Sequence, residues 1–139
     1  MSMAGRGDWN QGVIEAFRAN GGDVPHFGRS LVLLHHVGAR TGTARVSPVM
    51  GFPTDDGGWL IVASKGGSPE NPSWYHNLRA HPQTVVETPD DGTVEVTARE
   101  LDEDERAIAW PRITQRAPGF GDYERRTSRV IPVLKLSRR

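Results

Sequence analysis

Three basic side chains near glycine-containing turns carry the clearest chemical signal in the sequence. Arg40 and Arg45 lie in the polar segment "ARTGTAR", and Lys65 directly follows the apolar run "WLIVAS". Outward-pointing turn amides and guanidinium groups together bind phosphate or carboxylate well, and Gly66 and Gly67 would let the backbone approach a ligand. If the strands before these turns are neighbours, the three cations converge on one anion. The alternative is that both segments are ordinary solvated loops.

Aromatic residues follow the lysine and could contact a planar ligand. In "ENPSWYHNL", Asn71 is expected to cap a short helix with Pro72 in its first position. On such a helix Trp74 is more often part of the core than a ligand contact, and the role of Tyr75 stays open. Tyr123, in "APGFGDYERR", could donate a proton to a substrate, or it could be an ordinary half-buried tyrosine.

Several other chemistries are disfavoured. The chain has no cysteine, which excludes thiolate chemistry and suits a cytoplasmic protein. Its 17 Lys plus Arg balance 17 Asp plus Glu, so net charge does not steer it to nucleic acid or anionic membranes. His35 and His36 are adjacent in an expected strand and point to opposite faces. We therefore expect no metal, no nucleic-acid partner and no stable membrane association.

The elements that must position these residues form one domain. We expect a flexible tail over residues 1–8 and a single domain over residues 9–139. Asp102 and Glu105 indicate a capping box at the start of a helix, and "PDDG" between alternating runs indicates a hairpin. About six strands are expected, at residues 30–37, 46–52, 59–64, 84–88, 93–100 and 129–136, with helices from residues 9, 71 and 102 and one helical turn at 121–128.

Prolines refine this prediction. Pro48 and Pro132 argue that their strands are edge strands or bulged, and Pro111 should kink or end the helix that begins near Asp102. The strands form antiparallel hairpins without regular βαβ alternation, and no G-x-G-x-x-G is present. An α+β fold with a small antiparallel barrel therefore fits better than a Rossmann sheet.

Motifs in this order resemble a known family. "TGTARVSPV", "VASKGG", "ENPSWYHNLRAHPQ" and "DYERRTSRVIPVLKL" are similar to the deazaflavin-dependent nitroreductases of actinobacteria, which are split β-barrels that bind coenzyme F420. This coenzyme has a planar 8-hydroxy-5-deazaflavin ring, a ribityl chain, a phosphodiester and a tail of glutamates. By similarity, the residues along the phosphate and acidic tail would be Arg40, Thr41, Gly42 and Arg45, and Lys65 would meet the phosphate with Ser64 and Gly66 close by. The deazaflavin ring would be lined by Pro48, Met50, Val62 and Ala63. The border of the site would be formed by Ser73, Trp74 and Asn77.

The resemblance implies a reductase that transfers a hydride from the reduced coenzyme to a quinone, an enone or a nitro compound. Here one tyrosine, Tyr123, stands where relatives active on bulky nitroimidazoles carry several, which argues against that substrate. Two alternatives stay open: a split-barrel oxidoreductase that binds flavin mononucleotide (FMN), and a non-catalytic carrier of the deazaflavin. A homodimer is expected because pairing would cover exposed sheet edges.

Overall fold

A single antiparallel sheet forms the body of the protein. The computed structural model describes the backbone of residues 6–139 and the side chains of residues 9–139. Its strands run in the order β2-β1-β5-β6-β7-β4-β3, with every pair antiparallel. Their bounds are β1 (Leu31–Val37), β2 (Ala44–Met50), β3 (Phe52–Pro53), β4 (Trp59–Val62), β5 (Gln83–Thr88), β6 (Gly92–Glu100) and β7 (Val133–Arg138).

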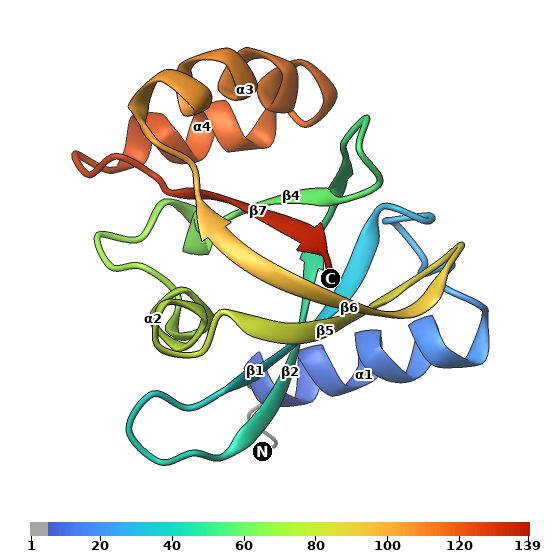
Figure 1. Cartoon of the computed structure of the whole chain (residues 1–139). Helices are drawn as coiled ribbons and strands as arrows, with labels where there is room; N and C mark the ends of the chain where they lie inside the picture. Colours follow the sequence, from blue (N-terminus) through green and yellow to red (C-terminus); the bar gives the residue numbers. More distant parts are fainter. Residues whose placement is uncertain (1–5) are drawn as a thin grey trace, which may run out of the picture.

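The sheet curls into a half-barrel, as Figure 1 shows. Strand β2 at one end of the strand order contacts β4 near the other end, so the two ends of the sheet approach each other without pairing. Alternate residues of the strands fill the interior, and Leu34, Ile61, Val86, Val96 and Leu136 are fully buried there in one cluster. The α+β class and the antiparallel barrel are therefore confirmed.

The expected strand over residues 46–52 is divided at Gly51 into β2 and β3, so the described part of the chain has seven strands where about six were expected. A side-chain carbon at Gly51 would lie 2.9 Å from the Val32 side chain, so the chain crosses β1 closely at this point. Pro48 lies on the edge strand β2, as expected. Pro132 does not mark an edge, because β7 lies between β6 and β4 and begins at Val133.

Within residues 6–139, four α-helices and one 3₁₀ turn flank the sheet: α1 (Arg6–Ala19), the turn at Lys65–Gly67, α2 (Ser73–Ala80), α3 (Glu103–Arg116) and α4 (Gly119–Arg126). Helix α1 begins at Arg6, so only residues 1–5 of the expected tail lie outside the described part of the chain. Helices α3 and α4 pack side by side (Figure 1) around Ile113, Phe120 and Ile131. Over the described residues, none of the helices is both long and apolar enough to span a membrane.

The helix ends test the local predictions. The capping box at α3 is confirmed, because Asp102 accepts from the Glu105 amide at 2.8 Å and Glu105 accepts from the Asp102 amide at 3.0 Å. Asn71 is not the cap of α2; Pro72 occupies that position. Pro111 does not end α3, which continues to Arg116. Ile113 is buried in the last turns of α3, and this burial offsets the loss of the backbone hydrogen bond that Pro111 cannot donate.

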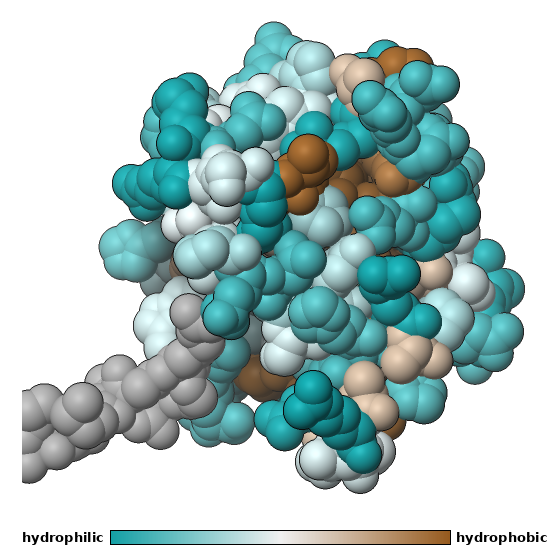
Figure 2. All heavy atoms as spheres, turned by 90° about the vertical axis from the view of Figure 1, so that its left-hand side faces the viewer, coloured by the Kyte–Doolittle hydropathy of each residue, from teal (hydrophilic) through white to brown (hydrophobic). Residues whose placement is uncertain are grey.

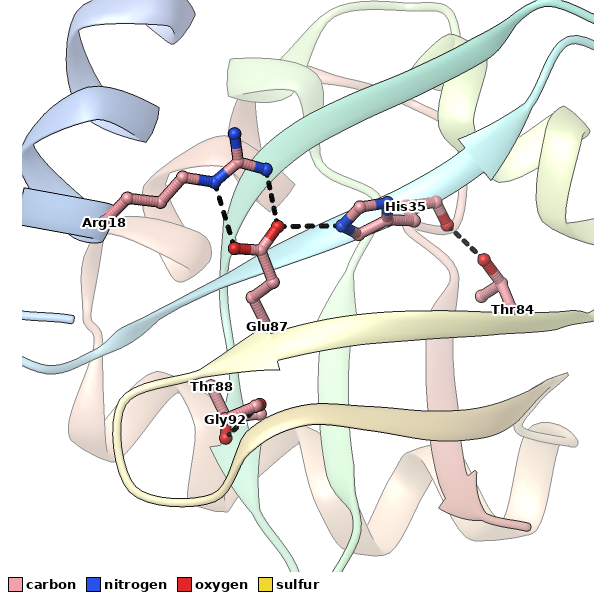
Figure 3. A network of polar contacts seen from close by, with 6 residues as sticks. All are labelled: Arg18, His35, Thr84, Glu87, Thr88 and Gly92. Atoms are coloured by element: carbon pink, nitrogen blue, oxygen red, sulfur yellow. Dashed lines mark hydrogen bonds and ion pairs between the residues drawn. The ribbon is translucent and has the colours of Figure 1, made fainter. Parts of the chain in front are cut away.

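Glu87 fastens α1 to the sheet (Figure 3). Its carboxylate accepts hydrogen bonds from Nε and Nη2 of Arg18 at 3.0 and 2.6 Å and lies 2.8 Å from Nε2 of His35. The hydrogen bond from Arg18 is the largest influence that lowers the pKa of Glu87. The anchored helix packs Val13 and Phe17 against the β1 side of the sheet.

Candidate active site

Two cavities flank α2. The β1–β2 turn, the β4–α2 segment and the segment before β7 lie on the left in Figure 1. Figure 2 views the molecule from that side and shows a largely hydrophilic face with small hydrophobic areas. One cavity lies at the β1–β2 turn, and the other is lined in part by the β4–α2 segment. Both are lined by Ser73 at the start of α2, so the two cavities adjoin there.

The first, which we name the arginine cavity, has a volume of about 620 Å³ and is lined by Gly38, Ala39, Arg40, Thr41, Arg45, Ser73, His76 and Asn77. Both arginines come from the hairpin between β1 and β2, and both are exposed. No carboxylate among residues 9–139 forms an ion pair with either of them. Their positive charges are therefore available to an anionic ligand.

The second, which we name the lysine cavity, has a volume of about 400 Å³. Its walls come from α1, the segment before β1, β2, β4, the Lys65 turn, α2 and α4. They are mainly apolar and aromatic, with a few polar groups, which is typical of sites for planar ligands. The lining residues are Trp9, Asn10, Phe27, Leu31, Ser47, Pro48, Val49, Met50, Val62, Ser64, Lys65, Gly66, Pro72, Ser73, Trp74, Phe120 and Tyr123.

The turn that presents Lys65 is conformationally unusual. Lys65 has a φ of 46°, in the left-handed region that non-glycine residues rarely adopt, and Gly66 and Gly67 follow with φ of 63° and 84°. Such strained backbone persists only where surrounding contacts hold it, and it concentrates at ligand sites. Lys65 Nζ lies 3.7 Å from Glu70, whose side chain is 80% exposed. This ion pair is weak and leaves the ammonium available to a ligand.

Arg129 holds this turn, and sequence reasoning missed it. Its Nε donates to the Ser68 carbonyl at 2.9 Å and one Nη to Asn71 Oδ1 at 2.6 Å. The other Nη donates to the carbonyls of Ala63 and Ser64 at 3.2 and 2.8 Å. Asn71 thus serves Arg129 instead of capping α2. An arginine in "TSRVIP" carries no local signal for this role, because its acceptors lie about sixty positions earlier in the chain.

Helix α4 packs directly on the same turn. A side-chain carbon at Gly67 would lie 2.9 Å from the Tyr123 carbonyl oxygen and 3.0 Å from Arg126 Cβ. The close approach that Gly67 allows is therefore to α4, whereas Gly66 has open space around it and lines the lysine cavity. The Tyr123 ring packs edge-on against Phe120, with the ring centroids 5.9 Å apart. Lys65 and Tyr123 are consequently positioned by one packed unit.

The two aromatic residues of α2 have different surroundings. Trp74 is buried in the main core cluster and also lines the lysine cavity, so the core assignment is confirmed and it borders the cavity as well. Tyr75 is buried too, and its hydroxyl donates to Glu100 at 2.6 Å. Its hydroxyl therefore connects α2 to β6, and Tyr75 lines neither cavity.

The three cations line two different cavities. Strand β1 pairs with β2 and β5, whereas β4 pairs with β3 and β7, so the strands that precede the two turns are not neighbours. Arg40 and Arg45 line one cavity and Lys65 lines the other. The condition under which the three cations would converge, that these strands are neighbours, is therefore not met, and the charges are distributed along two adjoining cavities.

Of the predicted binding residues, all except Gly42 and Ala63 line these cavities. Gly42 lies in the β1–β2 turn with a φ of 70°, and its amide donates to the Gly38 carbonyl. Ala63 is fully buried in the core. Tyr123, the expected proton donor, lines the lysine cavity. In the part of the chain described, no three His, Asp or Glu side chains are arranged to hold a metal ion.

A chain of polar contacts, with His36 and Asn77 buried at its centre, runs from one cavity wall to the other. Asn77 accepts a hydrogen bond from the Ala39 amide at 2.9 Å, and its Nδ2 lies 2.9 Å from His36 Nδ1. His36 Nε2 lies 2.9 Å from Ser47 Oγ. Burial, followed by the charges of Arg45 and His35, lowers the pKa of His36 to about 4, so this imidazole is neutral at pH 7.

Comparison with known proteins agrees with the geometry. Residues 9–137 match a family described as F420H(2)-dependent quinone reductase. The chain is also 38% identical over 111 residues to an F420H(2)-dependent quinone reductase of Mycobacterium tuberculosis (strain H37Rv), and the matched region covers 78% of this chain and 73% of that protein.

Solved structures show the same relationship. One described as an F420-H2 dependent reductase is 37% identical, with a TM-score of 0.69, and the match covers 78% of this chain and 95% of that one. Another, described as a domain-swapped dimer, is 34% identical with a TM-score of 0.73 and coverage of 96% and 100%. A Listeria innocua structure assigned to the pyridoxamine 5′-phosphate oxidases is 11% identical with a TM-score of 0.54 and coverage of 92% and 91%, and it shows the split-barrel fold alone.

Proposed function

Because this chain belongs to the family of F420H(2)-dependent quinone reductases, we propose that its lysine cavity holds the deazaflavin ring together with a quinone, and that its arginine cavity holds the anionic tail of the coenzyme. The expectation of an F420-dependent oxidoreductase is confirmed by the family, and the family's description specifies quinones among the substrates considered.

The observation that supports the proposal is that two cavities with different linings adjoin at Ser73. F420 is itself divided into a planar ring and a chain of phosphate and carboxylates. The lysine cavity offers apolar and aromatic walls, and the arginine cavity offers two guanidinium groups without carboxylate partners among residues 9–139. A ligand that extends from one cavity into the other would match both kinds of lining.

The residues of the lysine cavity fit a flat aromatic ring. Pro48, Met50, Val62 and Trp74 supply apolar surface, and each lines the cavity. Lys65 stands at the same cavity, where its ammonium can meet the phosphate between the ring and the tail. These contacts support the binding residues that the family resemblance implies, apart from Gly42 and Ala63.

When bound, the reduced coenzyme supplies a hydride. The chain's own part is to bind and orient the two partners, because a reacting pair must be held at about 3–3.5 Å for efficient transfer. The apolar walls, including Phe120, limit the access of water. The Tyr123 hydroxyl at the wall can donate a proton to the reduced product.

Two alternative functions make different predictions. An FMN-dependent split-barrel enzyme would bind FMN more tightly than F420, and it would not use the arginine cavity because FMN lacks a glutamate tail. A carrier would bind F420H2 without oxidising it in the presence of a quinone. Fluorescence titration with F420 and FMN, followed by absorbance assays of F420H2 oxidation with menadione, separates these cases. We expect tighter F420 binding and turnover; tighter FMN binding would overturn the proposal.

Lys65→Ala tests the lysine cavity. Loss of one charge-assisted contact should weaken F420 binding by about 1.5–3 kcal/mol, or roughly 10- to 150-fold. Arg112→Ala is the matched control, because it removes one exposed positive charge from α3, away from both cavities. Titration by coenzyme fluorescence measures both variants. Equal dissociation constants for the wild type and Lys65→Ala would remove Lys65 from the site.

We also propose that the chain forms a homodimer and acts in the cytoplasm. A similar solved structure is described as a domain-swapped dimer, and the edge strand β2 offers unpaired backbone groups that a partner could cover. The absence of cysteine suits a reducing compartment. Light scattering coupled to size-exclusion chromatography measures the mass, and a monomer at micromolar concentration would contradict the dimer.

A further inference from the structure

The chain of polar contacts Ala39–Asn77–His36–Ser47 has no role in the function proposed so far. It links the walls of the two cavities, because Asn77 lines the arginine cavity and Ser47 lines the lysine cavity. His36 and Asn77 are both buried, with side chains that contact each other at 2.9 Å. Buried polar groups must satisfy their hydrogen bonds, so each member of such a chain constrains the next.

The constraint starts at the backbone. The Ala39 N–H can only donate, so the Asn77 atom that it contacts at 2.9 Å must be the amide oxygen. The other end of the same amide is then the NH₂ group, which donates to His36 Nδ1. A nitrogen that accepts a hydrogen bond carries no proton, and a neutral imidazole has one N–H. His36 therefore carries its proton on Nε2.

The last link is Ser47. His36 Nε2–H donates to Ser47 Oγ at 2.9 Å, so the serine acts as the acceptor in this pair. Its own hydroxyl proton must point elsewhere, and among residues 9–139 the structure records no hydrogen bond that Ser47 Oγ donates. We propose that Ser47 is a hydrogen-bond donor aimed into the lysine cavity, and that Asn77 and His36 fix this direction as positioning residues.

The ligand atom that such a donor pairs with is a hydrogen-bond acceptor, such as a carbonyl oxygen or an unprotonated ring nitrogen. This inference rests on the proposed function, which places two conjugated rings with carbonyl groups in this cavity. The same chemistry could come from the coenzyme ring or from the quinone. A hydroxyl with its proton directed into the cavity would favour a ring that presents a free lone pair over one that presents an N–H at that point, because an N–H cannot accept a hydrogen bond.

The tautomer can be tested in the wild-type protein without any ligand. Long-range ¹H–¹⁵N spectra of the uniformly labelled protein at pH 7 should show His36 with a protonated Nε2 and an unprotonated Nδ1. The His36→Gln spectrum assigns the signals. A proton on Nδ1 would overturn the proposal, since Ser47 would then donate to His36 and not into the cavity.

The ligand contact is tested with Ser47→Ala and Ser47→Thr. Loss of one neutral hydrogen bond should raise the affected constant about 3- to 10-fold, and threonine should restore it to within about 2-fold because it keeps the hydroxyl. A rise in the F420 dissociation constant with an unchanged quinone KM identifies the coenzyme as the acceptor. A rise in the quinone KM with unchanged F420 affinity identifies the quinone.

The proposal fails if Ser47→Ala changes neither constant, or if threonine does not restore it. Circular dichroism melting shows that each variant is folded at the temperature of the titration, because Ser47→Ala also leaves His36 Nε2–H without its acceptor. Failure of the proposed function looks different: the wild type would bind no F420 at all, while the His36 spectrum would still report the tautomer.

Discussion

Arg129 should be the residue on which the Lys65 turn depends most. Its guanidinium donates four hydrogen bonds, to the carbonyls of Ala63, Ser64 and Ser68 and to the Asn71 side chain. At about 1 kcal/mol net for each bond, the sum is about 4 kcal/mol. Arg129 is half-exposed, so in the Arg129→Ala variant water can replace some of these hydrogen bonds. The substitution should therefore lower the free energy of unfolding by about 2–4 kcal/mol.

Arg129→Lys separates the contribution of the positive charge from that of the guanidinium geometry. Lysine keeps the positive charge, but a single ammonium cannot reproduce the planar fork that reaches acceptors on both sides of the turn. We expect about half of the loss of stability seen with alanine. Arg125→Ala is the matched control: this arginine is exposed on α4, and Asp122 is its one ion-pair partner among residues 9–139, so stability should change by no more than about 0.5 kcal/mol.

The same variants should weaken coenzyme binding without touching the ligand. If the competent turn is populated only one-tenth of the time, the apparent F420 dissociation constant rises about 10-fold. Urea unfolding measures stability, fluorescence titration measures affinity, and hydrogen exchange of the Ser68 amide, which donates to the Lys65 carbonyl at 3.1 Å, reports the turn itself. Unchanged exchange at Ser68 together with unchanged affinity in Arg129→Ala would refute this reasoning.

Three further predictions concern single contacts. Gly67→Ala should lose about 1–3 kcal/mol of stability in a urea titration, whereas Gly66→Ala, also at positive φ but in open space, should lose less; equal losses would refute the contact with α4. Glu87→Gln should destabilise by about 0.5–1 kcal/mol at pH 7. Because the pKa of Glu87 is below its usual value of 4.5, the difference from wild type should persist above that pH and disappear as the pH falls through the lowered pKa; a constant difference would contradict the bridge to Arg18. Tyr123→Phe should lower the turnover number by about 100-fold or more while the F420 dissociation constant changes little, and unchanged turnover would exclude Tyr123 as the proton donor.

Features encoded by neighbouring residues were predictable from the sequence. The β5–β6 hairpin follows from "PDDG" between alternating runs, and the α3 capping box follows from Asp102 and Glu105, since in both cases the interacting groups lie within a few positions of each other. Features that depend on distant residues were not. The insertion of β7 between β6 and β4 places Pro132 beside an interior strand, which no local pattern indicates.

The features of the candidate site also fall into those that the sequence predicts and those that only the fold reveals. The cavity-lining arginines, Lys65 and Tyr123 were predictable by residue type and resemblance, but their separation into two cavities required the strand order. Ala63 was expected beside Val62, yet successive residues of an extended chain face opposite sides. Val62 and Ser64 accordingly line the lysine cavity, while Ala63 lies in the core. Arg129 escaped prediction because its partners are brought to it only by the fold.

A crystal structure of the protein with F420 bound tests the central claim most directly. The account predicts the deazaflavin ring in the lysine cavity, in contact with Pro48 and Trp74, with the phosphate near Lys65 and the acidic tail along Arg40 and Arg45. A ring bound outside this cavity, or a tail that turns away from both arginines, would contradict it.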